Sequence, residues 1–165
     1  MEPNKSSVSS LFRFRRAVFT DADFLLELRN DPAVRAVSFS SDAIGRESHL
    51  KWLREKVTSP DHLILIGEID GDPIGQVRID RRSLEEAHIN IALIANFRGR
   101  GYGRMMLQKA ASIAFSHYAE LKRLRAYIKP ENSASAKSFS NAGYVFKGTA
   151  IEQGHACLEY ILNRV

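Results

Sequence analysis

A glycine-rich turn, Arg98-Gly99-Arg100-Gly101-Tyr102-Gly103-Arg104, joins two apolar segments and limits how this chain can fold. The run before it, Ile89 to Ile94, is typical of a buried strand, and the residues after it follow a helical pattern. Glycines let the backbone turn tightly and approach a ligand closely, and the first turn of a helix offers unpaired N–H groups at the positive end of its dipole. The segment therefore predicts a binding site for an anion such as phosphate.

Two common phosphate-binding loops do not fit this turn. It lacks the Gly-Lys-Ser/Thr ending of a nucleoside-triphosphate loop. A dinucleotide-binding fold needs an acidic residue about 20 residues downstream, and Glu120, near that distance, lies at the end of a helical stretch. The alternative is that the glycines serve only the sterics of a strand-to-helix connection.

Length and composition indicate one domain. The 165 residues, 44% of them apolar, suit a single core of ordinary size. We expect residues 1–10 to form a flexible N-terminus and residues 11–165 to form the domain. The N-terminal residues lack the apolar core of a signal peptide, and no stretch approaches the roughly 18 apolar residues of a membrane span. The sequence therefore predicts a cytoplasmic protein.

Cysteine and histidine usage gives no sign of a disulfide or a metal site. Cys157 is the single cysteine, so no internal disulfide can form. The five histidines are scattered along the chain without the close pairing of a zinc site. We expect Cys157 to be a small core residue and the protein to hold no metal.

The formal net charge of +5 leaves three kinds of partner open: nucleic acid, an anionic membrane or a phosphorylated small ligand. The basic residues are spread along the chain, without a long run or the aromatic–basic alternation of single-strand binders. Arg98, Arg100 and Arg104 cluster at the glycine turn, where a pyrophosphate needs compensation. This distribution favours a small anionic cofactor over nucleic acid or a membrane.

Hydrophobic periodicity predicts a mixed α/β chain that begins with a strand and two helices and continues into an antiparallel meander. Asp70-Gly71-Asp72 reads as the first hairpin turn of that meander. The strand before the glycine turn loses its alternation at Leu93-Ile94, which indicates a bulge. The expected strands are 11–17, 62–69, 73–80, 87–94, 124–128, 143–146 and 156–162, and the expected helices are 24–30, a turn at Pro32, 46–57, 103–118 and 132–141.

Two spaced motifs carry a resemblance to a known family. Arg98, Gly101 and Gly103 match Arg/Gln-x-x-Gly-x-Gly/Ala, which resembles the acetyl-CoA pyrophosphate loop of the GCN5-related N-acetyltransferase (GNAT) superfamily. The run Asn132-x-x-Ser135-x-x-Ser138-Phe139-x-x-x-Gly143-Tyr144 is similar to the signature of that family's last helix. The resemblance implies an α/β (α+β) GNAT fold with a mixed, mostly antiparallel sheet of six to seven strands and helices on both faces. The resemblance also implies that the chain is an acetyl-CoA-dependent N-acetyltransferase.

The same resemblance implies how acetyl-CoA (coenzyme A) is held. Main-chain N–H groups of the turn bind the pyrophosphate, with Arg98 or Arg100 adding charge. The splayed strand before the turn pairs with the pantetheine arm, so Ile91 and Leu93 contact the cofactor through main-chain groups. For Asn132, capping of its helix, worth about 1 kcal/mol, is the alternative role. The full expected set is Ile91, Leu93, Arg98, Gly99, Arg100, Gly101, Tyr102, Gly103, Arg104, Asn132, Ser135, Lys137 and Phe139.

Catalysis in this family is direct attack of an acceptor amine on the acetyl thioester. A lysine-like amine with a pKa of about 10.4 is neutral in roughly one molecule in 2,500 at pH 7, so a base would help. The family's catalytic tyrosine position holds Phe139, which cannot donate a proton. Tyr127, Ser135, Ser138, solvent or the acceptor ammonium are alternative proton donors to the thiolate. A non-catalytic acyl-CoA-binding module is the alternative of another class.

The expected base lies on the strand before the glycine turn. His88 and Asn90 project from one face of that strand, and Gln76 and Arg78 project together from the neighbouring strand. In the family this face lies under the first two helices and forms the acceptor cleft. His88 is therefore the expected base, because its pKa is naturally near neutrality; a solvated strand face is the alternative. The expected catalytic residues are His88, Asn90, Tyr127 and Ser138.

The N-terminal third carries the evidence on the acceptor. Leu28-Arg29-Asn30-Asp31-Pro32-x-Val34-Arg35 followed by His49-x-x-Trp52 is similar to acetyltransferases of nucleotide-linked amino sugars, including the pseudaminic-acid pathway enzyme, and to ribosomal-protein N-terminal acetyltransferases. Arg29, Arg35 and the tip of His49 would compensate an acceptor diphosphate, and Trp52 would stack; helix-surface charges and a core indole are the alternatives.

Charge favours the sugar nucleotide, because a basic peptide prefers acidic surroundings. We therefore expect a nucleotide-linked amino sugar as acceptor, a protein N-terminus as runner-up, no nucleic-acid or membrane partner, and a monomer or homodimer. The expected substrate-binding residues are Arg29, Arg35, His49, Trp52, Gln76 and Arg78.

Overall fold

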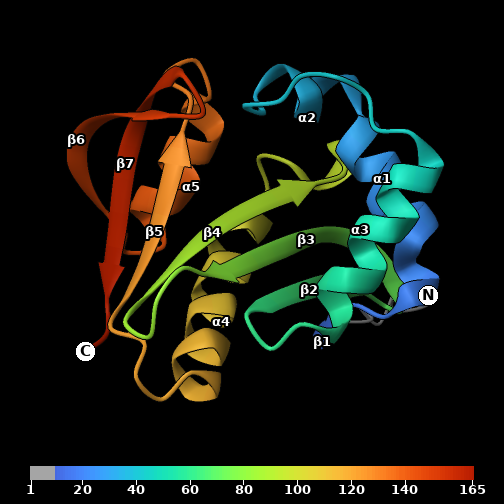
Figure 1. The fold of residues 1–165 in the computed structure, drawn as a ribbon, viewed down its shortest axis with the longest axis horizontal. Coiled ribbons are helices and arrows are strands. Elements are labelled where there is room, and N and C mark those ends of the chain that lie inside the picture. Colours follow the sequence, from blue (N-terminus) through green and yellow to red (C-terminus); the bar gives the residue numbers. More distant parts are fainter. Residues whose placement is uncertain (1–9) are drawn as a thin grey trace, which may run out of the picture.

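The structure, a computed structural model, describes residues 10–165 as one seven-stranded sheet with helices on both faces (Figure 1). The strand order is β1-β2-β3-β4-β5-β7-β6, and every neighbouring pair is antiparallel except β4 and β5. The predicted mixed, mostly antiparallel α/β fold is confirmed. The strands are β1 (Phe12–Arg16), β2 (His62–Ile69), β3 (Asp72–Arg81), β4 (Glu86–Leu93), β5 (Arg123–Ile128), β6 (Val145–Glu152) and β7 (His155–Asn163). The helices are α1 (Ala22–Asn30), α2 (Pro32–Ala36), α3 (Arg46–Thr58), α4 (Tyr102–His117) and α5 (Ser133–Asn141), with 3₁₀ turns η1 (Phe19–Asp21) and η2 (Ala95–Phe97).

The predicted flexible N-terminus, residues 1–10, lies outside the described residues except for Ser10. Within residues 10–165, none of the helices combines the length and apolar character that crossing a membrane requires.

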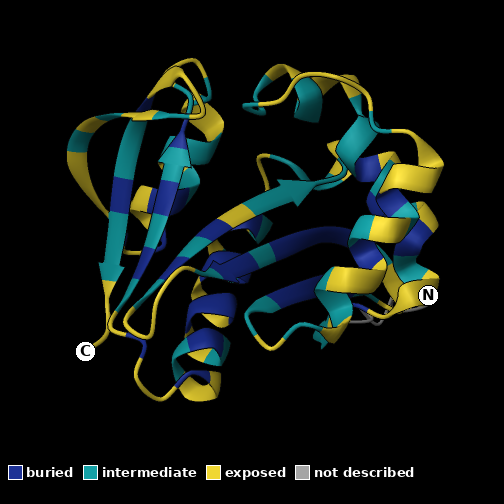
Figure 2. Ribbon diagram, viewed as in Figure 1, coloured by how far each residue is buried: buried dark blue, intermediate teal, exposed yellow. Residues whose placement is uncertain are grey.

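The sheet separates two hydrophobic cores. Side chains alternate along β2, so that Leu63 and Leu65 enter the core under α4 and α5, whereas Ile64 and Ile66 enter the core under α1 and α3. Leu53 of α3 is fully buried in this second core. Figure 2 shows the buried residues concentrated in β2, β3 and the inner sides of the helices. The two cores fix the sheet between two helical layers.

The cover by α1 and α3 ends near the middle of the sheet. Along β4, Ala87 and Ile89 are buried, but Asn90 is exposed although β4 is a central strand. Figure 1 shows α1 and α3 over the β1–β3 side, with α4 and α5 behind the sheet. Polar side chains of β4 therefore reach solvent in the centre of the fold.

The bulge predicted at Leu93-Ile94 is wrong. The β3–β4 ladder keeps one register from Gly75↔Leu93 to Arg81↔Ala87, and Ile94 N continues it by donating to Ile74 O at 2.9 Å. The apolar alternation fades because residues 91–93 lie at the rim of the core, where both faces of the strand are half-buried. Register shifts occur elsewhere, between Gly67 and Glu68 and between Phe146 and Gly148.

Strand β6 was also predicted too short and too early. Gly143 has a φ of 96° and follows the end of α5, and the strand starts only at Val145 and runs to Glu152. Its second half is half-exposed at the sheet edge and has no strong apolar alternation, so the sequence pattern missed it. The other elements lie within two residues of their predicted bounds.

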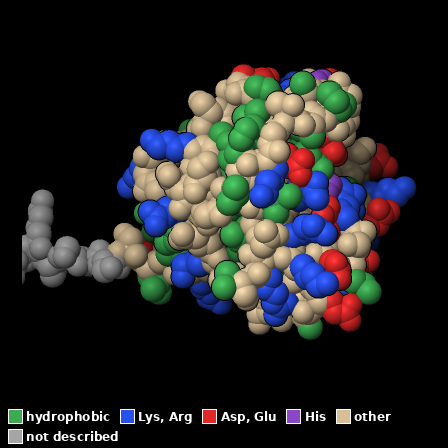
Figure 3. All heavy atoms as spheres, turned by 90° about the vertical axis from the view of Figure 1, so that its left-hand side faces the viewer, with side chains coloured by type: hydrophobic (Ala, Val, Ile, Leu, Met, Phe, Trp, Pro, Cys, Tyr) green, Lys and Arg blue, Asp and Glu red, His purple; other side chains and the backbone are tan. Residues whose placement is uncertain are grey.

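The β6 edge exposes several large apolar side chains, namely Val145, Phe146 and Ile151. Figure 3 faces this side and shows hydrophobic side chains among basic and acidic ones. Cys157 on the adjacent strand is buried, as predicted, and its Sγ lies 3.4 Å from Ala150 O.

Candidate active site

Strands β4 and β5 pair over a short stretch and then separate. Their parallel ladder consists of Glu86↔Arg123, Ala87↔Leu124 and His88↔Arg125. Beyond this stretch β4 continues to Leu93 and β5 to Ile128 (Figure 1). Within residues 10–165, the β5-facing edge of β4 beyond His88 therefore has no strand partner.

Main-chain groups of Ile91 and Leu93 line this open edge. In an antiparallel ladder, successive residues alternate between bonding to one neighbour and facing the other. Because Ile94 bonds to β3, Ile91 and Leu93 direct their N–H and C=O groups toward the missing partner. Ile91 and Leu93 are therefore oriented as the predicted main-chain contacts with an extended ligand require.

The glycine turn ends in an α4 N-terminus without an internal acceptor. Gly101 is its N-cap, with a left-handed φ of 86°, and no side chain caps the helix. The first N–H with a helical partner is that of Met105, which donates to Gly101 O at 3.2 Å. Within residues 10–165, the N–H groups of Tyr102, Gly103 and Arg104 have no hydrogen-bond acceptor, so they can bind an anion.

At their N-termini, the other described α-helices have either a side-chain cap or an acidic residue. Asp31 accepts hydrogen bonds from the first turn of α2, and Asn132 accepts one from Ser135 N at 3.2 Å in α5. Helices α1 and α3 carry acidic Asp23 and Glu47 in their first turns. Among the α-helices of residues 10–165, α4 is the one with neither a side-chain cap nor an acidic first turn.

Close packing brings this helix start to the open strand edge. A Cβ added to Gly103 would lie 3.0 Å from Ser138 Oγ and 3.7 Å from a methyl carbon of Leu93. The end of β4, the first turn of α4 and the middle of α5 therefore meet at Gly103. The predicted cofactor residues of these segments are brought together.

The arginines of the turn have protein partners. Arg98 Nε donates to Leu93 O at 2.8 Å, and its NH2 group lies 3.5 Å from the carboxylate of Asp31. Arg100 NH1 donates to Asn96 O at 3.1 Å. Arg98 thus joins the end of β4 to the α1–α2 corner, whereas Arg104 is exposed on the first turn of α4.

Helix α5 shows both the predicted cap and a correction. The capping role of Asn132 is confirmed by its bond to Ser135 N, and Lys137 is exposed. Phe139 is only 2% exposed, and its ring meets that of Tyr144 edge-on at 4.9 Å. The prediction of a cofactor contact is therefore not met by the Phe139 side chain, because its helix position faces the core.

The predicted polar face of the central strands is confirmed. Arg78 pairs with Asn90 and Asp80 pairs with His88 across β3 and β4, so these side chains share the face under α1 and α3. The neighbouring strand adds Tyr127, whose ring meets that of His88 edge-on at 5.2 Å. His88, Asn90 and Tyr127 therefore lie beside the point where β4 and β5 separate.

The surroundings of His88 favour its neutral form. Burial lowers its pKa below the ordinary value of 6.5, and the charge of Arg82 acts in the same direction, partly opposed by Glu152 and Glu86. Its Nε2 lies 3.9 Å from Glu86, a carboxylate that Arg125 and Arg123 already hold at 2.8 and 3.1 Å. This environment favours the neutral imidazole of His88, which is the form that accepts a proton.

His49 does not reach the polar face. It is 3% exposed, and its Nε2 donates to Ala22 O at 3.1 Å. Its predicted contact with an acceptor is therefore wrong, because the side chain turns into the core between α1 and α3. Its ring instead stacks on Trp52 at 5.6 Å, and the guanidinium of Arg78 lies 5.6 Å from the same indole. Trp52 thereby supports Arg78.

Of the remaining predicted acceptor residues, Gln76 lies on the polar face of β3, and Arg29 and Arg35 lie in the last turns of α1 and α2. Gln76 is 9% exposed, and its Oε1 is buried without a hydrogen-bond partner. Arg29 and Arg35 donate to the carbonyl oxygens of Ser40 and Ser41, in the segment between α2 and α3.

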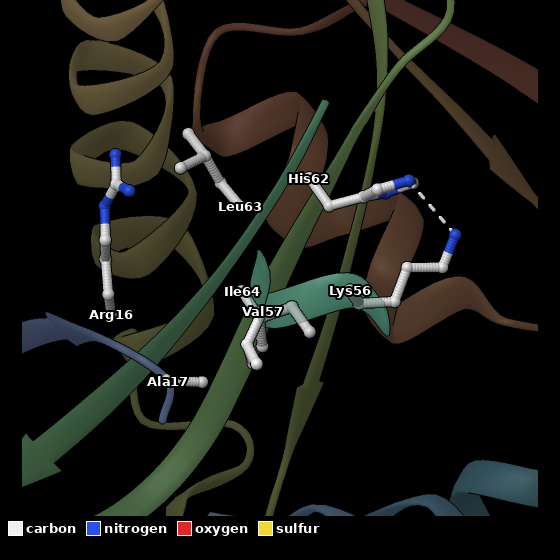
Figure 4. Close-up of a pocket in the computed structure, with 7 residues that line it drawn as sticks. All are labelled: Arg16, Ala17, Lys56, Val57, His62, Leu63 and Ile64. Carbon is white, nitrogen blue, oxygen red and sulfur yellow. Dashed lines mark hydrogen bonds between the residues drawn. The ribbon is translucent and has the colours of Figure 1, made fainter. Parts of the chain in front are cut away.

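A small, partly open cavity of about 20 Å³ lies at the start of β2, between β1, β2 and the end of α3 (Figure 4). Lys56 Nζ and His62 Nε2 approach to 3.1 Å at its margin, and His62 Nδ1 donates to Asp80 at 2.7 Å. The cavity has room for about one water, so it is not a substrate site. Within residues 10–165, no group of three or more His, Cys, Asp or Glu side chains could hold a metal.

Sequence patterns missed the contacts between distant segments. The ring of Phe39, between α2 and α3, lies 6.1 Å from that of His155 at the β6–β7 turn. Glu152 of β6 is close enough to influence His88. No local motif marks these residues, because their contacts depend on how the end of the chain folds beside its beginning.

Comparisons with known proteins agree with this architecture. Residues 12–145 match a family model described as an acetyltransferase (GNAT) domain. A search of curated proteins found no match.

Solved structures share the fold. A spermidine N-acetyltransferase from Vibrio cholerae, in complex with CoA and spermine, is 15% identical with a TM-score of 0.83, over 92% of this chain and 95% of that chain. Aminoglycoside acetyltransferase AAC(6′)-Ib, in complex with coenzyme A and kanamycin, is 15% identical with a TM-score of 0.80, over 93% and 95%. A GNAT-family acetyltransferase from Streptococcus pneumoniae is 22% identical with a TM-score of 0.73, over 93% and 100%.

Proposed function

Because this chain belongs to the GNAT acetyltransferase family, it is an N-acetyltransferase that uses acetyl-CoA, and we propose that it acetylates the primary amine of a small acceptor in a ternary complex. Residues 11–165 act as one domain in this proposal. Within this class of acceptors, we propose a nucleotide-linked amino sugar.

One observation carries the donor assignment: the unpaired edge of β4 leads directly to the uncapped N-terminus of α4. Ile91 and Leu93 offer main-chain groups to an extended amide-containing arm, as an added strand would use them. The N–H groups of the first turn of α4 suit a pyrophosphate at the end of that arm. These two features are contiguous, which fits a single ligand with an extended arm and a phosphate group.

The chemistry assigned to the chain is proton transfer and positioning. Acetyl-CoA, when bound, would supply the acetyl group of its thioester, and coenzyme A would be released as the free thiol. His88 Nε2 takes one proton from the acceptor ammonium, which frees the amine nitrogen for attack. Asn90, exposed on the same face, holds the acceptor beside it.

The second amine proton must reach the departing sulfur. Of the predicted hydroxyls, Tyr127 has the strongest support, because its ring contacts that of His88. Ser138 lies beside Gly103 at the start of α4, which makes it the competing donor. Phe139 is excluded from this role because it has no exchangeable proton.

The acceptor class is supported by charge. Arg78 lies on the polar face, and its charge and that of Arg35 act on Arg29, so the three favour an anionic acceptor over a polycation or a basic peptide. An amino sugar carrying a nucleoside diphosphate has both the amine and the negative charge.

The test incubates the protein with acetyl-CoA and one amine at a time: a UDP-linked 4-amino sugar, glucosamine, spermidine and a peptide with a free N-terminus. Release of free thiol measures transfer. Turnover that is highest with the UDP-linked sugar is the expected result. Turnover with the peptide alone would contradict the sugar assignment, and acetyl-CoA binding without turnover of any amine would contradict the catalytic proposal.

A further inference from the structure

We propose that Arg29, Arg35 and Arg78 form an anion-binding subsite that holds a phosphate or diphosphate group of the acceptor. The inference rests on the proposed function and adds to it the residues that select the acceptor. Arg29 and Arg35 come from the consecutive helices α1 and α2, and Arg78 comes from β3, which lies far from them in the sequence.

Arg29 is the centre of this subsite. It lies in the last turn of α1, and its NH2 group donates to Ser40 O at 2.7 Å. Its NH1 group is buried without a hydrogen-bond partner among the described residues. A buried donor without an acceptor destabilises the protein, and a ligand oxygen would satisfy it.

Arg35 and Arg78 each make a hydrogen bond through Nε, which leaves their two terminal guanidinium nitrogens available. Arg35 Nε donates to Ser41 O at 2.9 Å, and Arg78 Nε donates to Asp80 at 3.0 Å. Within residues 10–165, the terminal nitrogens of these two guanidiniums have no hydrogen-bond partner. A guanidinium fixed at Nε presents a planar fork of donors that matches two phosphate oxygens.

The charges of Arg78 and Arg35 lie close enough to Arg29 to act on its guanidinium. Burial lowers the pKa of Arg29, and the charges of Arg78 and Arg35 lower it further. Asp80 pairs with Arg78 through one carboxylate oxygen at 3.0 Å and with His62 through the other at 2.7 Å. A bound anion would relieve this repulsion, whereas a cationic acceptor would increase it.

The position of Arg78 sets the distance between anion and amine. Asp80 pairs directly with His88, so Arg78, two residues earlier, is the diagonal neighbour of His88 on the same face. Diagonal neighbours across two strands are about 7–8 Å apart, a span that a phosphorylated amino sugar bridges. Trp52 keeps Arg78 in place through the indole contact at 5.6 Å.

Gln76 adds an independent sign of a missing ligand. It precedes Arg78 by two residues on the same face of β3, and its buried Oε1 has no partner in the described part of the chain. A carbonyl oxygen accepts from a hydroxyl, so it fits the sugar part of such an acceptor better than its phosphate.

The test titrates inorganic pyrophosphate into protein already saturated with acetyl-CoA, so that the α4 N-terminus is filled. Calorimetry compares the wild type with Arg29→Gln, Arg78→Gln and the control Arg13→Gln, which removes the same charge from exposed β1. We expect Arg29→Gln and Arg78→Gln each to weaken pyrophosphate binding by about tenfold or more, and Arg13→Gln by less than about twofold. Acetyl-CoA affinity and the melting temperature of each variant establish that it is folded.

Absence of pyrophosphate binding to the acetyl-CoA-saturated wild type, or equal affinity in all variants, would overturn the subsite. Failure of the protein to bind acetyl-CoA at all would instead contradict the proposed function. Parallel titrations with inorganic phosphate and UDP separate the two sources of the anion. Tighter binding of UDP assigns a nucleoside diphosphate, and equal binding of phosphate assigns a phosphomonoester.

Discussion

The start of α4 and the polar face of β3 and β4 are the donor and acceptor halves of the site that we propose, and they are built from different groups. The donor half uses main-chain atoms of two adjoining segments, Ile91–Leu93 and Gly101–Arg104. The acceptor half uses side chains, such as Arg29, Arg78 and His88, that come from four different elements together with Tyr127. Main-chain recognition tolerates side-chain variation, whereas the acceptor half changes its ligand whenever one side chain changes.

The largest effect should come from a side chain of the acceptor half. His88→Ala removes the proposed base, so we expect kcat/KM at pH 7 to fall by about a hundredfold or more, with unchanged acetyl-CoA affinity. Steady-state kinetics and calorimetry measure the two quantities. His117→Ala, which removes an exposed imidazole from the end of α4, is the matched control and should keep full activity. Equal activity of both variants would contradict the base role and would indicate that His88 is only a solvated residue of the strand face.

The pH dependence of the same variant sharpens this assignment. The pKa of His88 is lowered, so its base form persists down to acidic pH, and wild-type kcat/KM should fall only as pH drops through a value below about 6.5. Without the base, activity depends on the free amine and should rise about tenfold per pH unit up to the amine pKa. The defect of His88→Ala should therefore shrink as pH rises. Parallel pH profiles for the two proteins would contradict a base role.

A smaller effect is expected from the donor half. Gly101→Val places a β-branched residue at a φ of 86°, which costs about 1–3 kcal/mol and distorts the first turn of α4. We expect acetyl-CoA affinity to fall by at least about tenfold, while inorganic pyrophosphate binding at the arginine subsite is retained. Gly45→Val is the control, because Gly45 caps α3 at an ordinary φ of −72°. Unchanged acetyl-CoA affinity in Gly101→Val would refute the assignment of the turn.

The smallest effect should be structural. Asn132→Ala removes the cap of α5, so the free energy of unfolding should fall by about 1 kcal/mol. Chemical denaturation measures this loss, with exposed Ser133→Ala as control. A fall in acetyl-CoA affinity beyond about twofold would show that Asn132 also contacts the cofactor.

The donor half was the easier half to predict from the sequence. Glycine at a left-handed helix start and asparagine at a helix cap leave local signatures, so the roles of Gly101 and Asn132 follow from a few neighbouring residues. The face shared by His88 and Asn90 follows from strand alternation alone. These predictions needed no knowledge of how distant segments pack.

The errors concern packing between elements. His49 and Phe139 were expected at ligands and are buried, because helix periodicity does not fix how a helix is rotated against its neighbours. The unpaired atoms of Arg29 and Gln76 and the influence of Glu152 on His88 likewise depend on tertiary arrangement. The bulge at Leu93-Ile94 was inferred from a loss of alternation that the rim of the core explains equally well.

The side chain of Arg98 spans the two halves of the proposed site. Its guanidinium bonds to Leu93 O on the donor strand and lies beside Asp31, which caps the helix that carries Arg35. A ligand arm that paired with the edge of β4 would compete with Arg98 for the carbonyl oxygen of Leu93. It would thereby alter the contact between Arg98 and Asp31. Thermodynamic linkage is reciprocal: if donor binding changed the affinity for the acceptor by this route, acceptor binding would change the affinity for the donor by the same factor.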